Sequence, residues 1–263
     1  MKRPVITLLT DFGLADHYAG AMKGVMLGIC PDVQLVDISH EIRPYAITEA
    51  AFTLSQAWTC FPPGTVHLVV VDPGVGSARR PILAEASGHY FVAPDNGVLT
   101  MLYETATAHM AREITASRFF RQPVSRTFHG RDIFAPVAAH LANGVAPDEF
   151  GNRIDDPLWL GFAKPKPTGP KTWAGTILKV DRFGNLITNL DSEAWKRLAS
   201  EPFEVKVGGI LVSAVASNYA EMPPGDLFVI EGSAGFLEIS LNRGSAANVT
   251  GARPGDPVEL RLL

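Results

Sequence analysis

The pattern of hydrophobic and polar positions in the first part of the chain predicts strands that alternate with helices. Residues 5–10, 34–39 and 66–71 are short apolar runs rich in β-branched side chains, which is typical of strands buried on both faces. Between them, apolar side chains recur at helical spacing over residues 18–29 and 50–58. This order predicts an α/β domain, and we expect its sheet to be mostly parallel.

The same pattern continues to about residue 162, where the chain changes character. A further strand is predicted over residues 90–93 and a further helix over residues 133–141. Residues 163–171 contain three prolines, which predicts a stiff linker. We therefore place the N-terminal α/β domain at residues 1–162.

Residues 172–263 predict a smaller all-β domain, folded as a barrel or a sandwich. Turn residues such as Gly184-Asn185 and Pro254-Gly255 separate short runs of strand-forming side chains, and one helix is predicted over about residues 192–199. The predicted strands are residues 175–181, 186–190, 203–207, 210–215, 227–231, 236–241 and 258–263.

Composition narrows the classes of protein to which the chain could belong. Its 263 residues are 46% hydrophobic and 19% charged, which is ordinary for a folded protein with a real core. A formal net charge of −4 argues against nucleic-acid binding, and no apolar stretch reaches the roughly 18 residues of a membrane span. The two cysteines, Cys30 and Cys60, form no Cys-x-x-Cys motif. We therefore expect a cytoplasmic protein without nucleic-acid or membrane partners.

Two predicted strands of the α/β domain end in aspartate, at Asp11 and Asp72. Ligands of open α/β sheets bind at the carboxyl ends of strands, so both carboxylates are candidate site residues. Asp72 opens the loop Pro73-Gly74-Val75-Gly76, and Arg79 follows closely enough to pair with it and keep it ionised. The alternative is that each aspartate only caps a turn, and spacing alone does not choose.

His129 is a third candidate, because it stands beside Gly130 just before a predicted helix and could act as a general acid or base. A packed loop histidine is the alternative. Arg80, next to Arg79, is expected to be a solvated surface residue. The sequence has no motif for a metal site, a nucleophilic serine, a phosphate-binding loop or a dinucleotide, so we expect no cofactor and no metal.

In the β domain, the turn Asp181-Arg182-Phe183-Gly184-Asn185 puts an aromatic ring, an amide and a carboxylate close together. It predicts either an adenine slot, in which Phe183 stacks and Asn185 pairs with the base edge, or an ordinary Gly-Asn hairpin turn. A second polar cluster follows in residues 232–238 and 242–247. It contains Ser233, Phe236, Glu238, Asn242 and Arg243.

Together, in this order along the chain, the motifs are specific although each is weak alone. They are Thr10-Asp11-Phe12-Gly13, Val71 to Gly76 with Arg79, Ala93-Pro94-Asp95-Asn96-Gly97, Phe128-His129-Gly130-Arg131-Asp132, Asp181 to Asn189 and Ser233 to Ala247. The chain resembles the S-adenosylmethionine (SAM) hydroxide adenosyltransferases, or SAM hydrolases, which are related to fluorinase and chlorinase. The resemblance runs from about residue 5 to about residue 260.

The resemblance implies that SAM is the substrate and that water cleaves it at the ribose C5′ to adenosine and methionine. It also implies a homotrimer, with each active site at a subunit interface between an N-terminal domain and a neighbour's C-terminal domain. It assigns catalysis to Asp72, Arg79 and His129, and the ribose to Asp11 and Tyr45. The other substrate-binding positions that it implies are Asp181, Phe183, Asn185, Ser233, Phe236, Glu238, Asn242 and Arg243.

Three features separate the hydrolase from the halogenases. Fluorinase resembles this chain but has a tyrosine at the position of Asp72, a serine at that of Gly130 and an extra loop after the Asp72 region. A carboxylate repels a halide in a desolvated pocket, whereas it suits a water nucleophile. A SAM-dependent chlorinase and a non-catalytic protein that binds adenosine or SAM stay as alternative functions.

Overall fold

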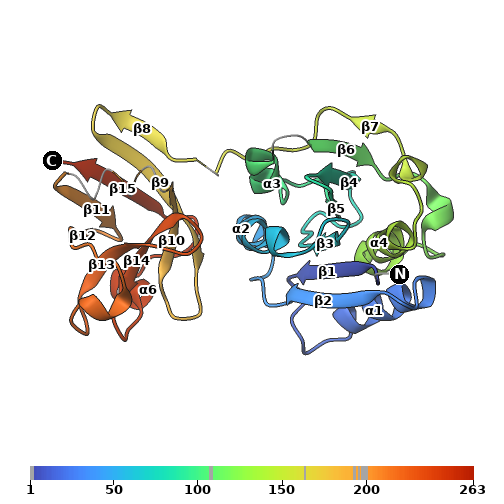
Figure 1. Ribbon diagram of the computed structural model, residues 1–263, viewed down its shortest axis with the longest axis horizontal. Helices are drawn as coiled ribbons and strands as arrows, with labels where there is room; N and C mark the ends of the chain where they lie inside the picture. The colour runs from blue at the N-terminus through green and yellow to red at the C-terminus, as the bar shows by residue number, and fades with distance from the viewer. Residues whose placement is uncertain (1–2, 107–108, 163, 192–193, 195, 197–200) are drawn as a thin grey trace. The chain divides into compact units, whose positions relative to one another are not determined.

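The computed structural model describes residues 3–106, 109–162, 164–191, 194, 196 and 201–263. It divides into two compact units, Met1–Leu160 and Gly161–Leu263, and each is described by itself (Figure 1). Each unit has its own sheet and its own hydrophobic core.

The first unit is built around a seven-stranded sheet with helices on both faces. Its elements are β1 (Val5–Thr10), α1 (Tyr18–Ile29), β2 (Gln34–Ser39), α2 (Ile47–Ala57), η1 (Trp58–Cys60), β3 (Val66–Val70), β4 (Pro81–Ala86), β5 (His89–Pro94), α3 (Thr100–Thr105), β6 (His109–Glu113), η2 (Ser117–Phe119), η3 (Gly130–Phe134), α4 (Ala135–Ala142), η4 (Pro147–Phe150) and β7 (Arg153–Ile154). Successive strand residues point to opposite faces, so Leu8 and Leu68 pack under α1 and α4, while Leu9 and Val69 pack under α2 and α3. The result is a three-layer α/β/α arrangement (Figure 1).

The sheet of the first unit is mixed, so the expectation of a mostly parallel sheet is not confirmed. Its order is β2-β1-β3-β5-β4-β6-β7; β2, β1, β3 and β5 pair in parallel, and β4, β6 and β7 pair antiparallel. The cause is the two-residue turn Ser87-Gly88, whose positive φ angles of 50° and 77° make a tight hairpin of β4 and β5. A parallel pair would need a crossover of about a dozen residues.

The parallel half of the sheet brings the two candidate aspartates together. β1 pairs with β3 in parallel, and Thr10 lies opposite Val70 at their carboxyl ends. Asp11 and the Asp72 loop therefore leave neighbouring strands at the same edge of the sheet, as the sequence predicted.

The second unit is an antiparallel sheet that nearly closes into a barrel. The strand order is β12-β11-β15-β9-β10-β14-β13, with β8 paired to β9 off this path. The two ends of the order approach each other, because Val215, just after β12, bridges to Val229 in β13. The elements are β8 (Lys166–Gly169), β9 (Thr172–Val180), β10 (Leu186–Asp191), β11 (Phe203–Val207), β12 (Ile210–Val212), η5 (Tyr219–Glu221), β13 (Leu227–Glu231), β14 (Phe236–Leu241), α6 (Ala246–Thr250) and β15 (Pro257–Leu262).

Two stretches differ from their sequence-based description or fall outside the structure. Within residues 163–171, expected to be a linker, β8 forms and pairs with β9; its proline is tolerated because β8 pairs with β9 and stands outside the main strand order. Most of the helix predicted over residues 192–199 lies outside the described residues. Among the described residues, no helix is long and apolar enough to cross a membrane.

Candidate active site

Asp72 lies just after β3 and opens a tight loop that ends at Arg79. Within the loop, Gly76 has a φ of +75°, and a Cβ atom there would lie 2.2 Å from the carbonyl oxygen of Arg126. Any other residue would therefore push the Asp72 loop away from the segment that precedes His129. This contact fixes the spacing of two loops that carry candidate catalytic residues.

The structure brings the three candidate catalytic side chains into direct contact. The Nε atom of Arg79 donates to Oδ1 of Asp72 at 3.1 Å, and its Nη2 atom donates to Oδ2. The same Nη2 atom lies 3.2 Å from Nδ1 of His129. Only 5% of the Asp72 side chain and 7% of the Arg79 side chain are exposed, and the guanidinium carbon lies 5.2 Å from the centre of the Phe134 ring. Such a bidentate pair fixes both partners in one geometry.

The contact between Arg79 and His129 determines which imidazole nitrogen carries the proton. A guanidinium has only donors, so Nδ1 of His129 accepts this hydrogen bond. Neutral His129 therefore carries its hydrogen on Nε2 and is a donor on that side. Burial lowers the pKa of His129, and the charge of Arg79 lowers it further, against the opposing charges of Asp72 and Asp132. The imidazole is thus neutral at pH 7.

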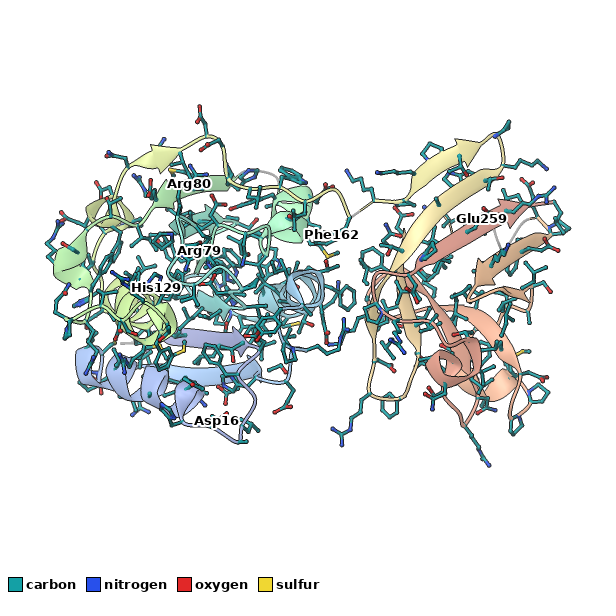
Figure 2. All side chains as sticks on the ribbon, turned by 180° about the vertical axis from the view of Figure 1, so that it is seen from behind. Asp16, Arg79, Arg80, His129, Phe162 and Glu259 are labelled. Carbon is teal, nitrogen blue, oxygen red and sulfur yellow. The ribbon has the colours of Figure 1, made fainter. Side chains whose placement is uncertain are left out.

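A pocket of about 320 Å³ opens beside this trio in the first unit. Four residues predicted from the sequence line it, namely Asp11, Tyr45, Asp72 and His129. Figure 2 shows Arg79 and His129 within the same unit. The other lining residues are mostly aromatic or apolar: Phe12, Tyr18, Pro44, Val70, Val75, Thr127, Phe128 and Gly130. The pocket therefore combines apolar walls with a few convergent polar groups, which is the usual composition of a small-molecule site.

Sequence reasoning missed the aromatic wall of this pocket. The ring of Tyr18 lies 5.5 Å from that of Phe12 and 5.0 Å from that of Phe128, measured between ring centres. Phe12 and Phe128 stand inside quoted motifs, next to Asp11 and His129, so their position in the sequence was a usable signal. No such signal marked Tyr18, because its spacing made it part of the predicted apolar face of the helix α1.

Asp11 holds Tyr45 in an unusual backbone conformation at the edge of the pocket. Its Oδ2 atom accepts a hydrogen bond from the Tyr45 N–H at 2.8 Å, and Tyr45 has a φ of +68°. A non-glycine residue there is strained by about 1 kcal/mol or more, which this hydrogen bond offsets in part. Burial raises the pKa of Asp11, the hydrogen bond from Tyr45 opposes the rise, and the charge of Asp72 adds to it. The side chain of Tyr45 is left 73% exposed.

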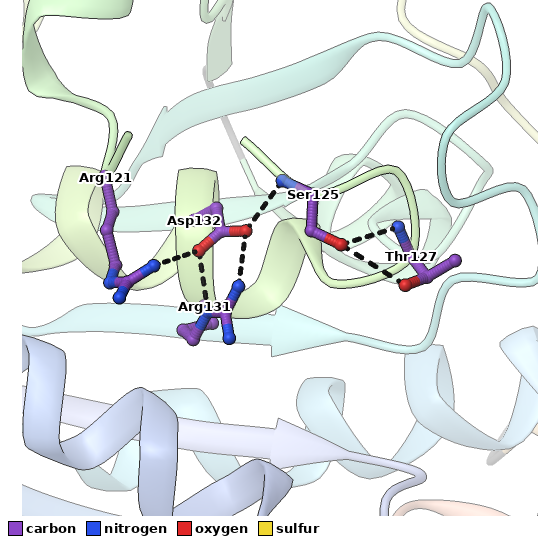
Figure 3. A network of polar contacts seen from close by, with 5 residues as sticks. All are labelled: Arg121, Ser125, Thr127, Arg131 and Asp132. Carbon is purple, nitrogen blue, oxygen red and sulfur yellow. Dashed lines mark hydrogen bonds and ion pairs between the residues drawn. The ribbon is translucent and has the colours of Figure 1, made fainter. Parts of the chain in front are cut away.

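The loop that carries His129 is held by Asp132, to which the sequence analysis gave no role. The buried carboxylate pairs with Arg131 at 2.7 Å and with Arg121 at 3.4 Å, and accepts the Ser125 N–H at 2.9 Å (Figure 3). Burial acts to raise the pKa of Asp132, but these partners outweigh it and lower the pKa. An ionised carboxylate therefore closes the loop, and His129 directly precedes the single π-helical turn η3 that contains this residue.

Arg80 is paired, contrary to the expectation of a solvated surface arginine. Its guanidinium donates to Oδ2 of Asp95 from Nε at 2.9 Å and from Nη2 at 2.6 Å. It also donates to Oδ1 of Asp156 at 2.8 Å. The sequence offered no sign of this, because Asp95 and Asp156 are distant along the chain.

In the second unit, Asp181 organises the turn predicted to bind adenine. Its Oδ1 atom accepts the backbone N–H groups of Phe183 and Asn185, both at 2.8 Å, and its Oδ2 atom accepts the Asn185 side-chain amide at 3.0 Å. Gly184 has a φ of +87°, and a Cβ atom there would lie 2.2 Å from Oγ of Ser245. Asn185 is buried, whereas the side chain of Phe183 is 78% exposed. The turn is a fixed frame that displays one aromatic ring.

Glu238 lies close to this turn and has a partner that the sequence analysis missed. The hydroxyl of Tyr219 donates to Oε2 of Glu238 at 3.0 Å, and Glu238 is buried. Burial raises the pKa of Glu238, and the charge of Asp181 raises it as well, against the effect of the Tyr219 hydrogen bond. Burial likewise raises the pKa of Tyr219 to about 12.

The remaining predicted positions of the second unit lie on β14 and the turns at its two ends. Ser233 is in the turn before β14, and Phe236 is the first residue of that strand. Asn242 follows the strand, and its side-chain amide donates to the carbonyl of Met222 at 2.6 Å. Arg243 comes next, with a φ of +56°. In the described part of the chain, no group of three or more His, Cys, Asp or Glu side chains is placed to hold a metal ion.

Known families and proteins match nearly the whole length of the chain. The family model described as the SAM hydroxide adenosyltransferase N-terminal domain matches residues 6–151, and the model of the C-terminal domain matches residues 175–259. An (R)-S-adenosyl-L-methionine hydrolase from Thermus thermophilus is 38% identical over 98% of this chain and 99% of that protein. A fluorinase from Actinoplanes sp. is 32% identical over 71% of this chain and 72% of that protein.

A solved structure matches the fold over nearly the whole chain. A solved structure of an uncharacterized conserved protein from Thermotoga maritima matches with a TM-score of 0.89 and 40% identity, over 97% of this chain and 99% of that one. The resemblance drawn from the sequence motifs is confirmed by the two family models. The chain belongs to the SAM hydroxide adenosyltransferase family.

Proposed function

We propose that this protein cleaves SAM with water at the ribose C5′ and releases adenosine and methionine. The observation that carries the proposal is the buried contact of Asp72, Arg79 and His129 at the wall of a pocket that also contains Asp11. (R)-SAM hydrolases from Thermus thermophilus and Methanocaldococcus jannaschii, 38% and 34% identical over nearly the full chain, support the same reaction.

The reaction is a displacement in which the nucleophile is the weak partner. A bond forms between the water oxygen and C5′ while the C5′–S bond breaks. The electron pair of that bond returns to sulfur, so methionine leaves as a neutral thioether, and the water loses a proton. Because the sulfonium is already a good leaving group, the protein has to orient and activate the water. Positioning of this kind lowers a barrier by about 7–11 kcal/mol in good cases.

The three side chains divide this work according to their hydrogen-bonding capacity. Nδ1 of His129 already accepts from Arg79, whereas Asp72 keeps lone pairs beyond its bonds to Arg79, so Asp72 takes a hydrogen bond from the attacking water and receives its proton. Neutral His129 donates from Nε2 to the same oxygen and orients it. Arg79 holds both groups from behind, and its charge favours the negative charge that develops on oxygen.

The remaining predicted residues bind the substrate. Asp11 accepts hydrogen bonds from the ribose hydroxyls, since Tyr45 occupies only one of its lone-pair sites. The exposed ring of Phe183 stacks on adenine, and Asn185 faces the base edge. Asp181 and Ser233 lie on the methionine side. The exposure of the Phe183 ring supports the stacking role, because an exposed ring offers its face to a base.

The test is to incubate pure protein with SAM in chloride-containing buffer and to identify every product. Adenosine and methionine in equal amounts are the expected result. 5′-Chloroadenosine would favour the chlorinase alternative, and unchanged SAM with measurable adenosine binding would favour a non-catalytic binding protein. We favour neither, because Asp72 places a carboxylate where a halide would have to approach.

We also propose that the protein works as a homotrimer whose active site is completed by a neighbouring subunit. The groups that handle water and ribose lie in the first unit, and the adenine frame lies in the second. Both carry exposed aromatic side chains, Tyr45 and Phe183, that a shared substrate would cover. Head-to-tail contacts of this kind close into rings.

Subunit mixing tests the assembly. An Asp72→Asn variant and an Asn185→Ala variant, dissociated and reassembled together, should regain part of the parent activity, because some interfaces pair two intact halves. Each variant reassembled alone is the control. An active monomer in light scattering, or no recovery in verified mixed trimers, would contradict the proposal.

We further propose that catalysis requires no metal or redox cofactor and that the protein works in the cytoplasm. The first follows from the leaving-group chemistry of the sulfonium, and the second from cysteines that are both free. Treatment with EDTA should leave kcat unchanged, and a loss restored by a divalent metal would refute the first point.

A further inference from the structure

The motif Ala93-Pro94-Asp95-Asn96-Gly97 has no role in the mechanism above, yet it contacts both ends of the Asp72–Arg79 loop. The side-chain Nδ2 of Asn96 donates to the carbonyl of Val71, the residue before Asp72, at 2.9 Å. The backbone N–H of Asp95 donates to the carbonyl of Arg80, the residue after Arg79, at 2.9 Å. Two consecutive residues of one motif therefore tie down the two stems of the catalytic loop.

The orientation of the Asn96 side chain is determined by a second contact. Its Oδ1 atom accepts the N–H of Val98 at 3.2 Å. Because one end of the amide faces a donor and the other faces a carbonyl, turning the amide over would break both hydrogen bonds. Neither an aspartate nor an alanine at this position can both donate to the carbonyl of Val71 and accept from the N–H of Val98.

Asp95 adds an ion pair with a buried carboxylate to the same arrangement. Its side chain is 4% exposed, and its Oδ2 atom accepts two hydrogen bonds from the Arg80 guanidinium. Its Oδ1 atom accepts the Leu158 N–H at 2.7 Å. Arg80 also pairs with Asp156, so its donors are directed at the protein (Figure 2 labels Arg80 beside Arg79). The loop stem after Arg79 is held through backbone and side chain together.

We propose that Asp95 and Asn96 are positioning residues, which keep Asp72 and Arg79 in the geometry that catalysis needs by fixing residues 71 and 80. Neither residue is among those that line the pocket in the described part of the chain. Their effect on turnover rests on the proposed hydrolase function. A displacement of about 1 Å at reacting groups lowers rates by about 10²-fold, so a loosened stem should be visible in kcat.

The first test compares Asn96→Ala and Asn96→Asp with a matched control, Asp156→Asn. Asp156 also pairs with Arg80, but its side chain is 71% exposed and it leaves the Arg80–Asp95 pair intact. Both Asn96 variants should lower kcat about 10- to 100-fold, with adenosine Kd within about threefold of the parent. The control should keep the parent kcat. An Asn96→Ala kcat within about threefold of the parent, at a temperature well below its Tm, would overturn the proposal.

Asp95→Asn is the second variant. It keeps the proposal testable if an Asn96 variant does not fold. It retains an oxygen for the Leu158 N–H but weakens the pair with Arg80. We expect kcat to fall while adenosine Kd is kept, as for Asn96. A lowered Tm with unchanged kcat in Asp95→Asn would assign Asp95 a purely structural role and overturn its part of the proposal.

The closing experiment does not depend on the reaction. Amide hydrogen exchange of Val75 and Ser77, whose N–H groups are bonded within the loop, reports its order directly. Exchange at both amides should be faster in Asn96→Ala than in the parent and unchanged in Asp156→Asn. Unchanged exchange in Asn96→Ala would overturn the proposal even if SAM turnover is confirmed. A parent protein that does not turn over SAM would refute the proposed function and leave this result standing.

Discussion

The Asp72–Arg79 loop of the first unit and the Asp181–Asn185 turn of the second are each organised by an aspartate, but in opposite ways. Asp181 directs its carboxylate at its own turn, where Phe183 and Asn185 donate to it. Asp72 instead pairs with a buried arginine that itself touches His129. The carboxylate of Asp181 therefore holds the conformation of its own turn, whereas the carboxylate of Asp72 is held in place for the reaction.

Exposure follows the same division. The Asp72 side chain is 5% exposed, whereas the ring presented by the second turn is 78% exposed. A buried, paired group is arranged before substrate arrives, as electrostatic catalysis requires. An exposed ring on a fixed frame gains most when a ligand covers it. We therefore expect changes in the Asp72–Arg79 loop to act on kcat and changes in the Asp181–Asn185 turn to act on binding.

The largest expected effect is that of Asp72→Asn. The amide removes both the proton acceptor and the charge that pairs with Arg79, so kcat should fall by about 10³-fold or more. Adenosine Kd should stay within about threefold. Arg79→Ala should act similarly, and the double variant should be little worse than either single one, because the residues act as a unit. Chromatographic assays of adenosine release measure all three, and near-parent turnover in Asp72→Asn would end the assignment.

Next in size is the loss of stability in Asp132→Ala. Removing this fully buried carboxylate leaves Arg131 and the Ser125 N–H without their partner, which should destabilise the first unit by about 3 kcal/mol. Urea unfolding measures the loss of stability, and hydrogen exchange should locate that loss in the first unit. Asp148→Ala, on the exposed surface of the same unit, is the control. Equal stability of Asp132→Ala and the parent would show that the loop does not depend on this carboxylate.

A smaller effect, on binding alone, is expected for Phe183→Ala. Losing one base-stacking ring should weaken adenosine binding by about 1–3 kcal/mol, or roughly 5- to 150-fold. Phe183→Tyr keeps the ring and should bind like the parent. Titration calorimetry gives Kd, and kcat at saturating SAM should change by less than about threefold. A large loss of kcat with unchanged Kd would reverse the division between the two units.

The smallest effect is a loss of stability at low pH in the first unit, which contains all seven histidines of the chain. Buried His67 bonds to Thr7 and His89; burial, together with the smaller effect of the neighbouring His89, lowers its pKa to about 3. In the unfolded chain its pKa is about 6.5. Between these values the unfolded state binds more protons, so stability falls as the pH falls below about 6.5.

In the second unit, the raised pKa of Glu238 has the opposite sign, because the folded state keeps its proton to higher pH and gains stability as the pH falls. Hydrogen exchange at pH 7.5 and pH 5.0 should therefore show protection lost in the first unit only. His67→Phe should flatten that dependence. Equal losses in both units would contradict this account.

The comparison also shows what the sequence could and could not predict. Periodicity predicted β1, β3, α1 and most strands of the second unit, because each has a clear alternation or apolar run. It missed β4 and β6, and with them the antiparallel edge, because a hairpin depends on Ser87 and Gly88 and not on hydrophobic pattern. A strand that contains proline, β8, was likewise taken for a linker.

For the site, the sequence predicted the charged residues better than their surroundings. Asp72 and Arg79 pair as their spacing within one loop indicated, whereas the contact of His129 with Arg79 was expected only from the family resemblance. The contacts of Asp132 with Arg121 and of Asn96 with Val71 join segments that the sequence does not show to be neighbours. The catalytic roles of these residues stay predictions until they are measured.

The most direct test of the central claim is hydrolysis of SAM in ¹⁸O-labelled water. If Asp72 and His129 direct water at C5′, the adenosine formed carries the label on its 5′ oxygen, and the methionine carries none. Asp72→Asn, assayed in parallel, should form labelled adenosine far more slowly. Adenosine without the label, 5′-chloroadenosine in chloride, or the absence of any product from the parent protein would contradict the account.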